Sequence, residues 1–281
     1  MMLRVLMLAM TGLIACAGAA FSQSASRPPV SQCQAIARNI PGVMFASFNT
    51  PGVQLAQAAA KKEEVKISFI GHSTYLIESP DGVTIATDYN GVYRPTVTPT
   101  VVTMNRAHST HFTLSPDPAI QYVLHGWSDT PGEKAEHRVL VGDVYIRNVA
   151  TDIRNRWGDY ESFQENGNSI FIFEVAGLCI GHLGHLHHEL TDTHYAEIGR
   201  LDVLMVPVDG GLTMGVDSMS RVVKRLRSAL ILPMHRTGPP LEQFLTMFGK
   251  SFQIAYATEP VIRVSMRNLP RQPQILVPKG M

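Results

Sequence analysis

Histidines are concentrated in one short stretch of the chain. Four of its eleven histidines fall within seven residues, in the run Cys179-Ile-Gly-His182-Leu-Gly-His185-Leu-His187-His188. The apolar segments at 170–175 and 178–180 read as two buried strands that lead into this run. A strand end holds side chains at a fixed separation, and neutral imidazole is the commonest protein ligand for zinc and similar ions. The stretch therefore predicts a metal or catalytic site; the competing interpretation is a histidine-rich surface loop.

Three histidines in different parts of the chain each follow an apolar strand. These are His111, His185 and His235, and we expect them to converge at one end of a sheet. Zinc in hydrolytic sites binds three protein side chains plus water, and it lowers the pKa of that water to roughly 7. Three imidazoles are therefore a sufficient ligand set. His108 is a candidate for a fourth ligand or for a general base beside the water.

Composition limits the classes of protein and of partner. The chain has 281 residues, of which 45% are hydrophobic and 17% charged, so it can bury a substantial core. Its formal net charge of +1 provides no basic surface field for nucleic acid. We therefore expect a small-molecule substrate and no nucleic-acid partner.

The first 22 residues read as an export signal. Arg4 precedes an apolar run at 5–15, and small residues then lead to a cleavage site after Ser22. The run is short for a membrane span, so we expect a soluble periplasmic protein with no integral span in the mature chain. A segment ending at Cys16 also resembles a lipobox, which makes a lipoprotein anchor the alternative. Of the remaining cysteines, Cys179 reads as a small core residue, and one pair alone does not establish a disulfide to Cys33.

The rest of the chain divides into a linker and one domain. Residues 23–63 are rich in Ser, Pro, Gln and Ala and read as an N-terminal linker with a short helix around 31–39. The domain occupies residues 64–281 and opens with strands at 65–70, 74–78 and 83–88, which predict an antiparallel meander. Further strands are predicted at 100–103, 120–124, 139–141, 144–149, 203–206, 252–255 and 261–264, with helices at 218–230 and around 241–248. Strands followed by strand-helix alternation predict an α+β fold of stacked sheets covered by helices.

Five segments, in their order and spacing, resemble the metallo-β-lactamase superfamily. They are the run Val65–Ile77 with Gly71-His72, Ala86-Thr-Asp88, His182-Leu-Gly, Val206–Met214 with Asp209-Gly-Gly211, and Pro233-Met-His235. They are most similar to the branch of metal-dependent hydrolases that includes the ascorbate-phosphate lactonase-like and N-acylphosphatidylethanolamine phospholipase D-like proteins. The resemblance covers about 65–264. It implies a four-layer αββα sandwich with a metal site at the sheet edges and hydrolysis by metal-activated water.

The metal motif departs from the superfamily pattern. The usual His-x-His-x-Asp-His stands here as Arg106-Ala-His108-Ser-Thr110-His111, so arginine replaces the first histidine and threonine replaces the aspartate. An arginine at that position would place a fixed cation where a second metal normally lies. That disfavours a second ion, and the guanidinium could instead hold a substrate carboxylate or phosphate or stabilise an oxyanion. The alternative is that Arg106 only fills a decayed site.

The later ligand positions also differ. The superfamily's Gly-Asp, whose carboxylate bridges two metals, matches Gly184-His185, while the final histidine is kept as His235. The mid-chain histidine is missing, with Asp152 as the nearest candidate. Our hypothesis is one zinc ion held by His108, His111, His185 and His235, with His108 and Arg106 as the catalytic candidates. A two-metal site and a metal-free protein are the alternatives.

Four other residues have weaker assignments. His182, His187 and His188 read as residues that orient His185 or as alternative ligands, and spacing does not separate these roles. His72 lies at a turn after a strand and could face the site, although a turn histidine is more often structural. The sequence thus predicts an exported metal-dependent hydrolase acting on an ester, lactone, amide or phosphodiester. The alternative is an inactive relative that binds a ligand or metal in the same cleft.

Overall fold

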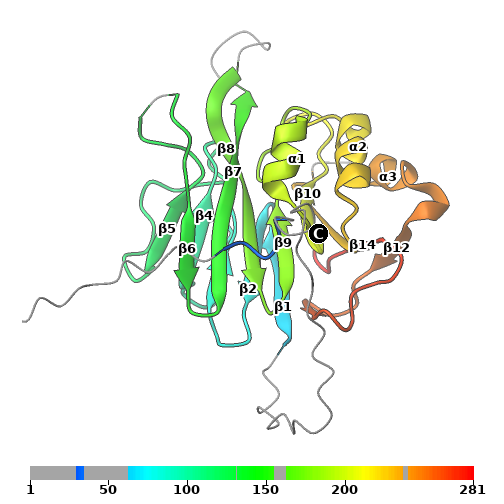
Figure 1. The fold of residues 1–281 in the computed structure, drawn as a ribbon, viewed down its shortest axis with the longest axis horizontal. Helices are drawn as coiled ribbons and strands as arrows, with labels where there is room; N and C mark the ends of the chain where they lie inside the picture. The colour runs from blue at the N-terminus through cyan, green and yellow to red at the C-terminus, as the bar shows by residue number, and fades with distance from the viewer. Residues whose placement is uncertain (1–29, 35–62, 131, 155–162, 237–239) are drawn as a thin grey trace, which may run out of the picture.

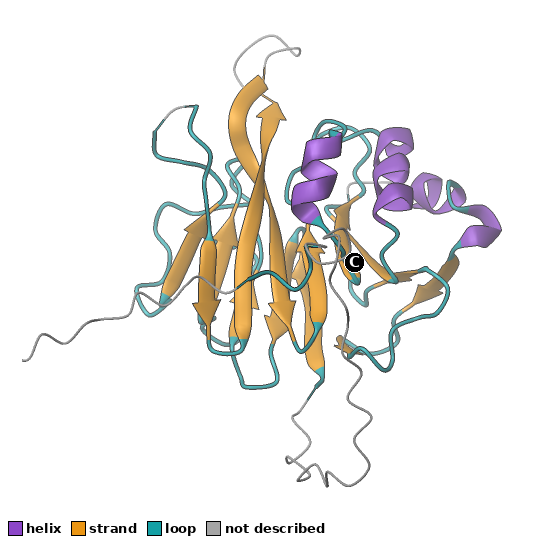
Figure 2. Cartoon of the chain, in the orientation of Figure 1, coloured by secondary structure: helices purple, strands orange, loops and turns teal. Residues whose placement is uncertain are grey.

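The computed structural model describes residues 30–34, 63–130, 132–154, 163–236 and 240–281. In these residues two β-sheets pack together, and helices cover one of them (Figure 1, Figure 2). The predicted export signal lies outside the described residues, as do most of the predicted linker and its short helix.

The first sheet has six strands and contains the predicted meander. Its strand order is β13-β1-β2-β3-β4-β5. The strands are β1 (Val65–Gly71), β2 (Thr74–Glu78), β3 (Thr84–Ala86), β4 (Val101–Met104), β5 (Tyr122–His125) and β13 (Val261–Val264). β1, β2 and β3 pair antiparallel as predicted, and β3, β4 and β5 then pair parallel. The carboxyl ends of β4 and β5 therefore meet at one edge of the sheet.

The second sheet has eight strands, in the order β12-β14-β11-β10-β9-β8-β7-β6. The strands are β6 (Arg138–Val141), β7 (Val144–Arg154), β8 (Phe163–Val175), β9 (Leu178–His182), β10 (Val203–Pro207), β11 (Leu230–Met234), β12 (Gln253–Tyr256) and β14 (Gln274–Val277). β6 to β9 form antiparallel pairs, whereas β9, β10 and β11 run parallel. β9 and β11 therefore end at the same edge.

Both faces of the second sheet are buried. Ile170 and Ile172 of β8 pack into a core with the helices, while Phe171 and Phe173 pack into the core between the sheets. Because side chains alternate along a strand, a continuous apolar run supplies both cores at once. The helices are α1 (Asp192–Ile198), α2 (Val216–Leu226) and α3 (Pro240–Thr246), followed by a short 3-10 helix at Gly249–Ser251. Within the described part of the chain, no helix has the length and apolar character needed to cross a membrane.

Residues 30–34, which we call the N-terminal strap, are fixed to the second sheet. A disulfide joins Cys33 to Cys179 of β9. The Ser31 hydroxyl and the Gln32 N–H both donate to the Glu174 carboxylate, which also accepts from the Arg147 guanidinium. Cys179 is buried as the sequence predicted, but it is covalently bonded and not only a packing residue.

Candidate metal centre

Five histidines from four strand ends meet at the edges of the two sheets. His72 lies in the turn after β1, His108 and His111 follow β4, His185 follows β9, and His235 follows β11. His111, His185 and His235 are buried, whereas His72 and His108 are partly exposed. The convergence of strand ends predicted from the sequence is therefore present in the structure, with His72 in addition.

Four of these imidazoles form a group compact enough to hold one ion. The ligand nitrogens of His72, His108, His111 and His235 all lie within 4.8 Å of one another. The ring centroids of His72 and His235 are 4.0 Å apart, and the Nε2 atoms of His235 and His108 are 3.3 Å apart. We call these four residues the imidazole group.

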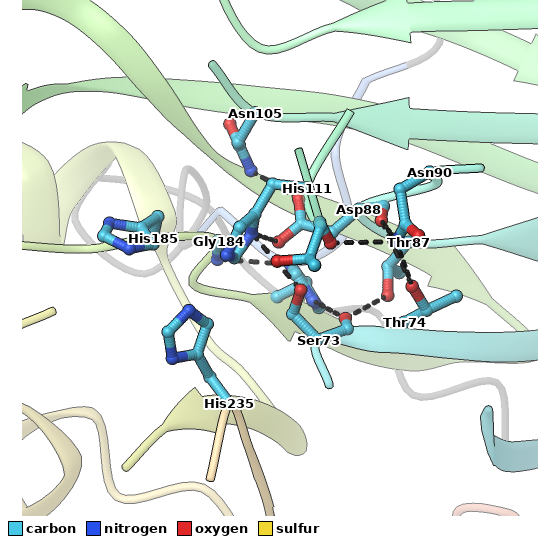
Figure 3. A network of polar contacts seen from close by, with 12 residues as sticks. Ser73, Thr74, Thr87, Asp88, Asn90, Asn105, His111, Gly184, His185 and His235 are labelled. Atoms are coloured by element: carbon cyan, nitrogen blue, oxygen red, sulfur yellow. Dashed lines mark hydrogen bonds and ion pairs between the residues drawn. The ribbon is translucent and has the colours of Figure 1, made fainter. Parts of the chain in front are cut away.

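His185 lies beside the imidazole group. Its ring centroid is 4.9 Å from that of His111 and 5.1 Å from those of His108 and His235 (Figure 3). Both of its ring nitrogens are buried without a hydrogen-bond partner, as are Nε2 of His72 and Nε2 of His111. A buried polar atom without a partner costs about 1–3 kcal/mol. Four buried nitrogens without partners at one point indicate that these atoms bind a group such as a metal ion.

Three of the imidazoles, those of His72, His111 and His185, are held in the neutral form that binds metals. Burial, followed by the neighbouring His235, lowers the pKa of His72 to about 4. Burial likewise lowers the pKa values of His111 and His185 well below their usual range, and neighbouring histidines add to the effect. Metal binding requires neutral histidine, and nitrogen donors suit zinc and similar divalent ions. The residues present therefore fit a divalent metal ion.

Two buried carboxylates orient two of the rings. His111 Nδ1 donates to Asp88 Oδ2 at 2.6 Å, and His235 Nδ1 lies 2.5 Å from Asp209 Oδ2. Burial alone would raise the pKa of Asp209. His235 and the N–H groups of Gly211 and Thr213 outweigh that effect and hold this pKa below its usual range. With Nδ1 engaged, each ring presents its Nε2 lone pair to the group, an arrangement common around metal-bound histidines.

The backbone at the site is in an unusual conformation. His72, Asp88 and His235 adopt positive φ values of 53°, 42° and 55°. The left-handed region costs a residue other than glycine on the order of 1–3 kcal/mol and persists where the surrounding structure enforces it. A hydrogen bond from His235 N to the His72 carbonyl, 2.7 Å long, joins two of these strained positions. The surrounding packing thus fixes the directions of the His72 and His235 rings, and the strained backbone lowers local stability.

A polar network behind the rings positions His185. Its N–H donates to Asn168 Oδ1, while Asn105, which packs against Gly184, donates to Asp88 Oδ1 (Figure 3). His182 Nδ1 accepts from Gly184 N, so its Nε2 carries the proton and donates to the Ser73 carbonyl. His182 therefore joins the turn after β1 to the loop after β9. Its contacts are those of an orienting residue.

Asp152 lies outside the imidazole group. Its carboxylate accepts from Asn166 N, and its own N–H donates to His188 Nε2. Arg106 is exposed and borders a cavity of about 480 Å³, together with Trp127 and Phe163. None of the five site histidines is among the described residues that line this cavity.

His72 is the site residue that the sequence analysis underestimated. The sequence leaves open that it faces the site but favours a structural role, because it lies at a turn; its nitrogen is part of the imidazole group. The available signal was its place directly after a buried strand, in the same relation to β1 that His235 has to β11. Its left-handed backbone, which brings the ring toward the other histidines, has no equally clear signature in the sequence.

Comparison with known proteins agrees with this fold and site. A family model described as "Beta-lactamase superfamily domain" matches residues 66–235. The chain is therefore a member of the β-lactamase superfamily. Two relatives named "UPF0173 metal-dependent hydrolase" are 25% and 24% identical, from Methanosphaera stadtmanae and Pyrococcus furiosus. The matches cover 67% and 68% of this chain and 92% and 95% of those proteins.

Solved structures give the same family. A protein from Thermotoga maritima, described as a Zn-dependent hydrolase of the metallo-β-lactamase superfamily, is 28% identical with a TM-score of 0.55. The match covers 76% of this chain and 97% of that one. A metal-dependent hydrolase structure from Parabacteroides distasonis, 14% identical with a TM-score of 0.53 over 66% of this chain and 89% of that one, shares the fold. The resemblance and the metallo-β-lactamase fold predicted from the sequence are confirmed.

Proposed function

We propose that this protein is a metal-dependent hydrolase that uses zinc, is exported, and cleaves an ester, lactone, amide or phosphodiester bond of a small molecule. The observation that carries the proposal is the imidazole group with His185 beside it. Within the described part of the chain, both ring nitrogens of His185 and the Nε2 atoms of His72 and His111 are buried without a hydrogen-bond partner. The names of the relatives support metal-dependent hydrolysis, and the description of the Thermotoga maritima protein supports zinc. All five donors are nitrogen, which also favours zinc over magnesium or calcium.

The residues have distinct proposed tasks. His72, His108, His111 and His235 would hold the ion, and His185 is close enough to join them or to contact the substrate. A bound divalent ion would supply Lewis-acid chemistry, polarising the reacting bond and acidifying a water. Asp88 and Asp209 fix the rings of His111 and His235. His108 is partly exposed, so it is also the candidate general base, and its Nδ1 lies 2.8 Å from the Thr110 hydroxyl.

Arg106 is proposed to contact the substrate and not the ion. Its guanidinium is exposed beside the cavity of about 480 Å³, two residues before His108 along the same loop. From there it could hold an anionic group of the substrate or stabilise an oxyanion. The sequence hypothesis of a single ion rests on this arginine standing where a second metal ligand would be expected.

Elemental analysis of gently purified protein tests the metal. We expect close to one equivalent of zinc, lost in His235→Ala and kept in His194→Gln, a change on α1 away from the imidazole group. Two firmly bound equivalents would contradict the one-ion hypothesis, and none after reconstitution with zinc would contradict the metal site. Ester, lactone, phosphodiester and β-lactam substrates then test turnover. Activity should disappear with a chelator and return with zinc; a loaded protein that turns over none of them would favour a non-catalytic relative.

Export is tested on protein from the native host. The apolar run at 5–15 supports a cleaved signal, and the disulfide between Cys33 and Cys179 supports an oxidising compartment such as the periplasm. Intact-mass spectrometry should give a mature chain that begins near Gln23. A mass beginning at a diacylated Cys16 would favour a lipoprotein, and a full-length mass would contradict processing.

A further inference from the structure

A second set of orphaned polar atoms lies outside the imidazole group. Arg154 Nε and both ring nitrogens of His187 are buried without a hydrogen-bond partner. Neither residue belongs to the imidazole group. A guanidinium N–H and an imidazole left unpaired together are unfavourable, because each has lost water without gaining a protein partner.

Cross-strand pairing brings these two residues to the same place. Arg154 ends β7 and pairs with Phe163 at the start of β8, and the Phe163 ring centroid is 5.6 Å from that of His187. The positive charge of Arg154 acts on His187: after burial, it is the largest cause that lowers the pKa of His187 to about 4. Phe163 therefore lies beside both residues, and we call Arg154 and His187 the Arg154–His187 cluster.

The Arg154–His187 cluster is connected to the metal centre through one loop. Arg154 Nη1 donates to the Gly211 carbonyl at 3.4 Å, and Gly211 N donates to Asp209 Oδ1 at 2.8 Å. The other oxygen of Asp209 contacts His235 of the imidazole group. Only one loop thus separates the guanidinium from a metal ligand. A small molecule at the metal could reach Arg154.

None of the nearby carboxylates that the structure describes neutralises the charge of Arg154. Among the described residues, Arg154 makes no ion pair, although three carboxylates are found in this region. Asp209 is occupied by His235, Gly211 N and Thr213 N, and Asp152 accepts from Asn166 N. Glu189 pairs with Arg221. Within the described residues, the Arg154–His187 cluster therefore has a positive charge without a carboxylate partner, beside an imidazole without a hydrogen-bond partner.

We propose that Arg154 and His187 form an oxyanion-binding site that holds a carboxylate or phosphate group of the substrate. The proposal rests on the proposed hydrolase function, since it assigns the substrate class of the same centre: small molecules carrying an anionic group in addition to the bond that is cleaved. Arginine suits this task because its planar N–H groups match two oxygens of a carboxylate or phosphate. His187 supplies one further N–H donor, and Phe163 limits water access on one side.

Calorimetric titration of the full-length, zinc-loaded protein tests the site. Sulfate serves as the tetrahedral probe and acetate as the planar probe, and the one that binds more tightly identifies the phosphate or the carboxylate class. Arg154→Gln and His187→Gln should each weaken the preferred probe, the former by about 10- to 100-fold, as expected for a charge-assisted hydrogen bond. Arg154→Lys, which keeps the charge but not the planar fork, should recover part of that loss. The exposed Arg271→Gln serves as the matched control and should bind as the unmodified protein does.

Two further variants separate this site from its neighbours. His235→Ala should lose zinc yet still bind the probe, because Arg154 and His187 do not depend on the ion. If the unmodified protein instead holds no zinc after reconstitution and turns over no substrate, but still binds the probe, the proposed function fails and the anion site stands. Probe binding that is equal in Arg154→Gln and the unmodified protein would overturn the site. Probe binding that disappears only in His235→Ala or only in Arg106→Gln would likewise overturn it, since the anion would then bind at the metal or at Arg106.

Discussion

His185 is the residue at which this chain differs most consequentially from the superfamily pattern. The sequence resemblance assigns its position to a bridging carboxylate, and here a neutral imidazole is buried with both nitrogens unpaired. A neutral ligand leaves more positive charge on a bound ion than a carboxylate does, which favours a more acidic bound water. The imidazole ring is placed by Asn168, which accepts from its backbone N–H.

Alanine substitutions distinguish a ligand from an orienting residue. His185→Ala should weaken zinc binding severely, because it removes a donor that has no other partner. His182→Ala should cost only about 10- to 100-fold in zinc affinity, as is typical of residues that position ligands. Competition with a zinc-binding dye measures both. Full zinc occupancy in His185→Ala together with its loss in His182→Ala would show that the ligand has been assigned to the wrong histidine of the run.

The sequence predicts which residues belong to the site, but it does not predict the direction of every side chain. His108, His111, His185 and His235 follow apolar strands, so the sequence places them at sheet ends. Assigning His72 to the same group requires the backbone angles of its turn, which the surrounding packing enforces. Arg106 was expected to stand near the metal by alignment with a motif. The structure places it exposed beside a cavity, and its role at the metal centre stays a prediction.

At the scale of elements, the loop after β9 depends on Gly184. Its φ is +62°, and a Cβ there would lie 2.3 Å from Asn105 Nδ2 and 2.4 Å from Asn168 Oδ1. Both amides belong to the network that positions His111 and His185. The loop after β9 thus packs so closely against Asn105 and Asn168 that a methyl group at Gly184 has no space.

Gly184→Ala should lower the free energy of unfolding by about 2–4 kcal/mol, combining a left-handed alanine with overpacking. It should also lower zinc occupancy, because the two amides must move. Gly82→Ala is the matched control: its φ is +92°, but nothing lies within 4 Å of the added Cβ. That variant should lose only about 1 kcal/mol and keep its zinc. Urea unfolding and elemental analysis measure both effects, and equal losses in the two variants would refute the close fit at Gly184.

Some helices and strands could be predicted from the sequence, and others could not. The meander and the buried strands were predicted because apolar runs between turn residues are typical of strands. The short helix α1 was missed because its seven residues, Asp192–Ile198, bury only Ile198 and so show no apolar periodicity. Its cap pairs Thr191 with His194, whereas the usual capping sequence has Glu or Gln at that position. β14 was also missed, because its four residues pair parallel with β11 and β12, which are distant in the sequence. β7 and β8 extend beyond the predicted apolar segments, toward Arg154 and Phe163.

At the scale of the whole molecule, the buried histidines make stability depend on pH. Burial lowers the pKa values of His111, His182 and His185 in the folded chain below the usual 6.5, and His111 and His182 are fully buried. As pH falls through 6.5, the unfolded chain takes up protons that the folded chain does not. Stability is therefore complete above that pH and declines as pH falls toward the folded pKa values.

Metal-free protein should accordingly lose stability on acidification. Each fully buried histidine contributes a slope of about 1.4 kcal/mol per pH unit below pH 6.5. Urea midpoints of chelator-treated protein, measured between pH 7.5 and 5.5, should fall only in the lower part of that range. His182→Gln should show a shallower slope than the unmodified chain, whatever its absolute stability. A midpoint that is constant down to pH 5.5 would contradict the neutral, buried state of these rings.

The disulfide is a second property of the whole molecule, because it links residues separated by 146 positions. Loss of such a link typically lowers the free energy of unfolding by about 2–5 kcal/mol. Cys33→Ser should show this loss, and a reducing agent should produce it in the unmodified protein but have no further effect on the variant. Zinc content should stay unchanged in both, since neither cysteine belongs to the imidazole group. Identical urea curves with and without reductant would show that the link contributes nothing.

The same link makes part of the chain a covalent ring. His72, His108 and His111 lie inside the ring closed by Cys33 and Cys179, whereas His185 and His235 lie on the chain that continues from it. A protease that cuts one peptide bond inside the ring opens it without releasing either piece. The two sets of ligands then find each other again within one molecule, at a rate independent of dilution. After reduction, the same cut turns reassembly of the metal centre into an encounter between two separate molecules.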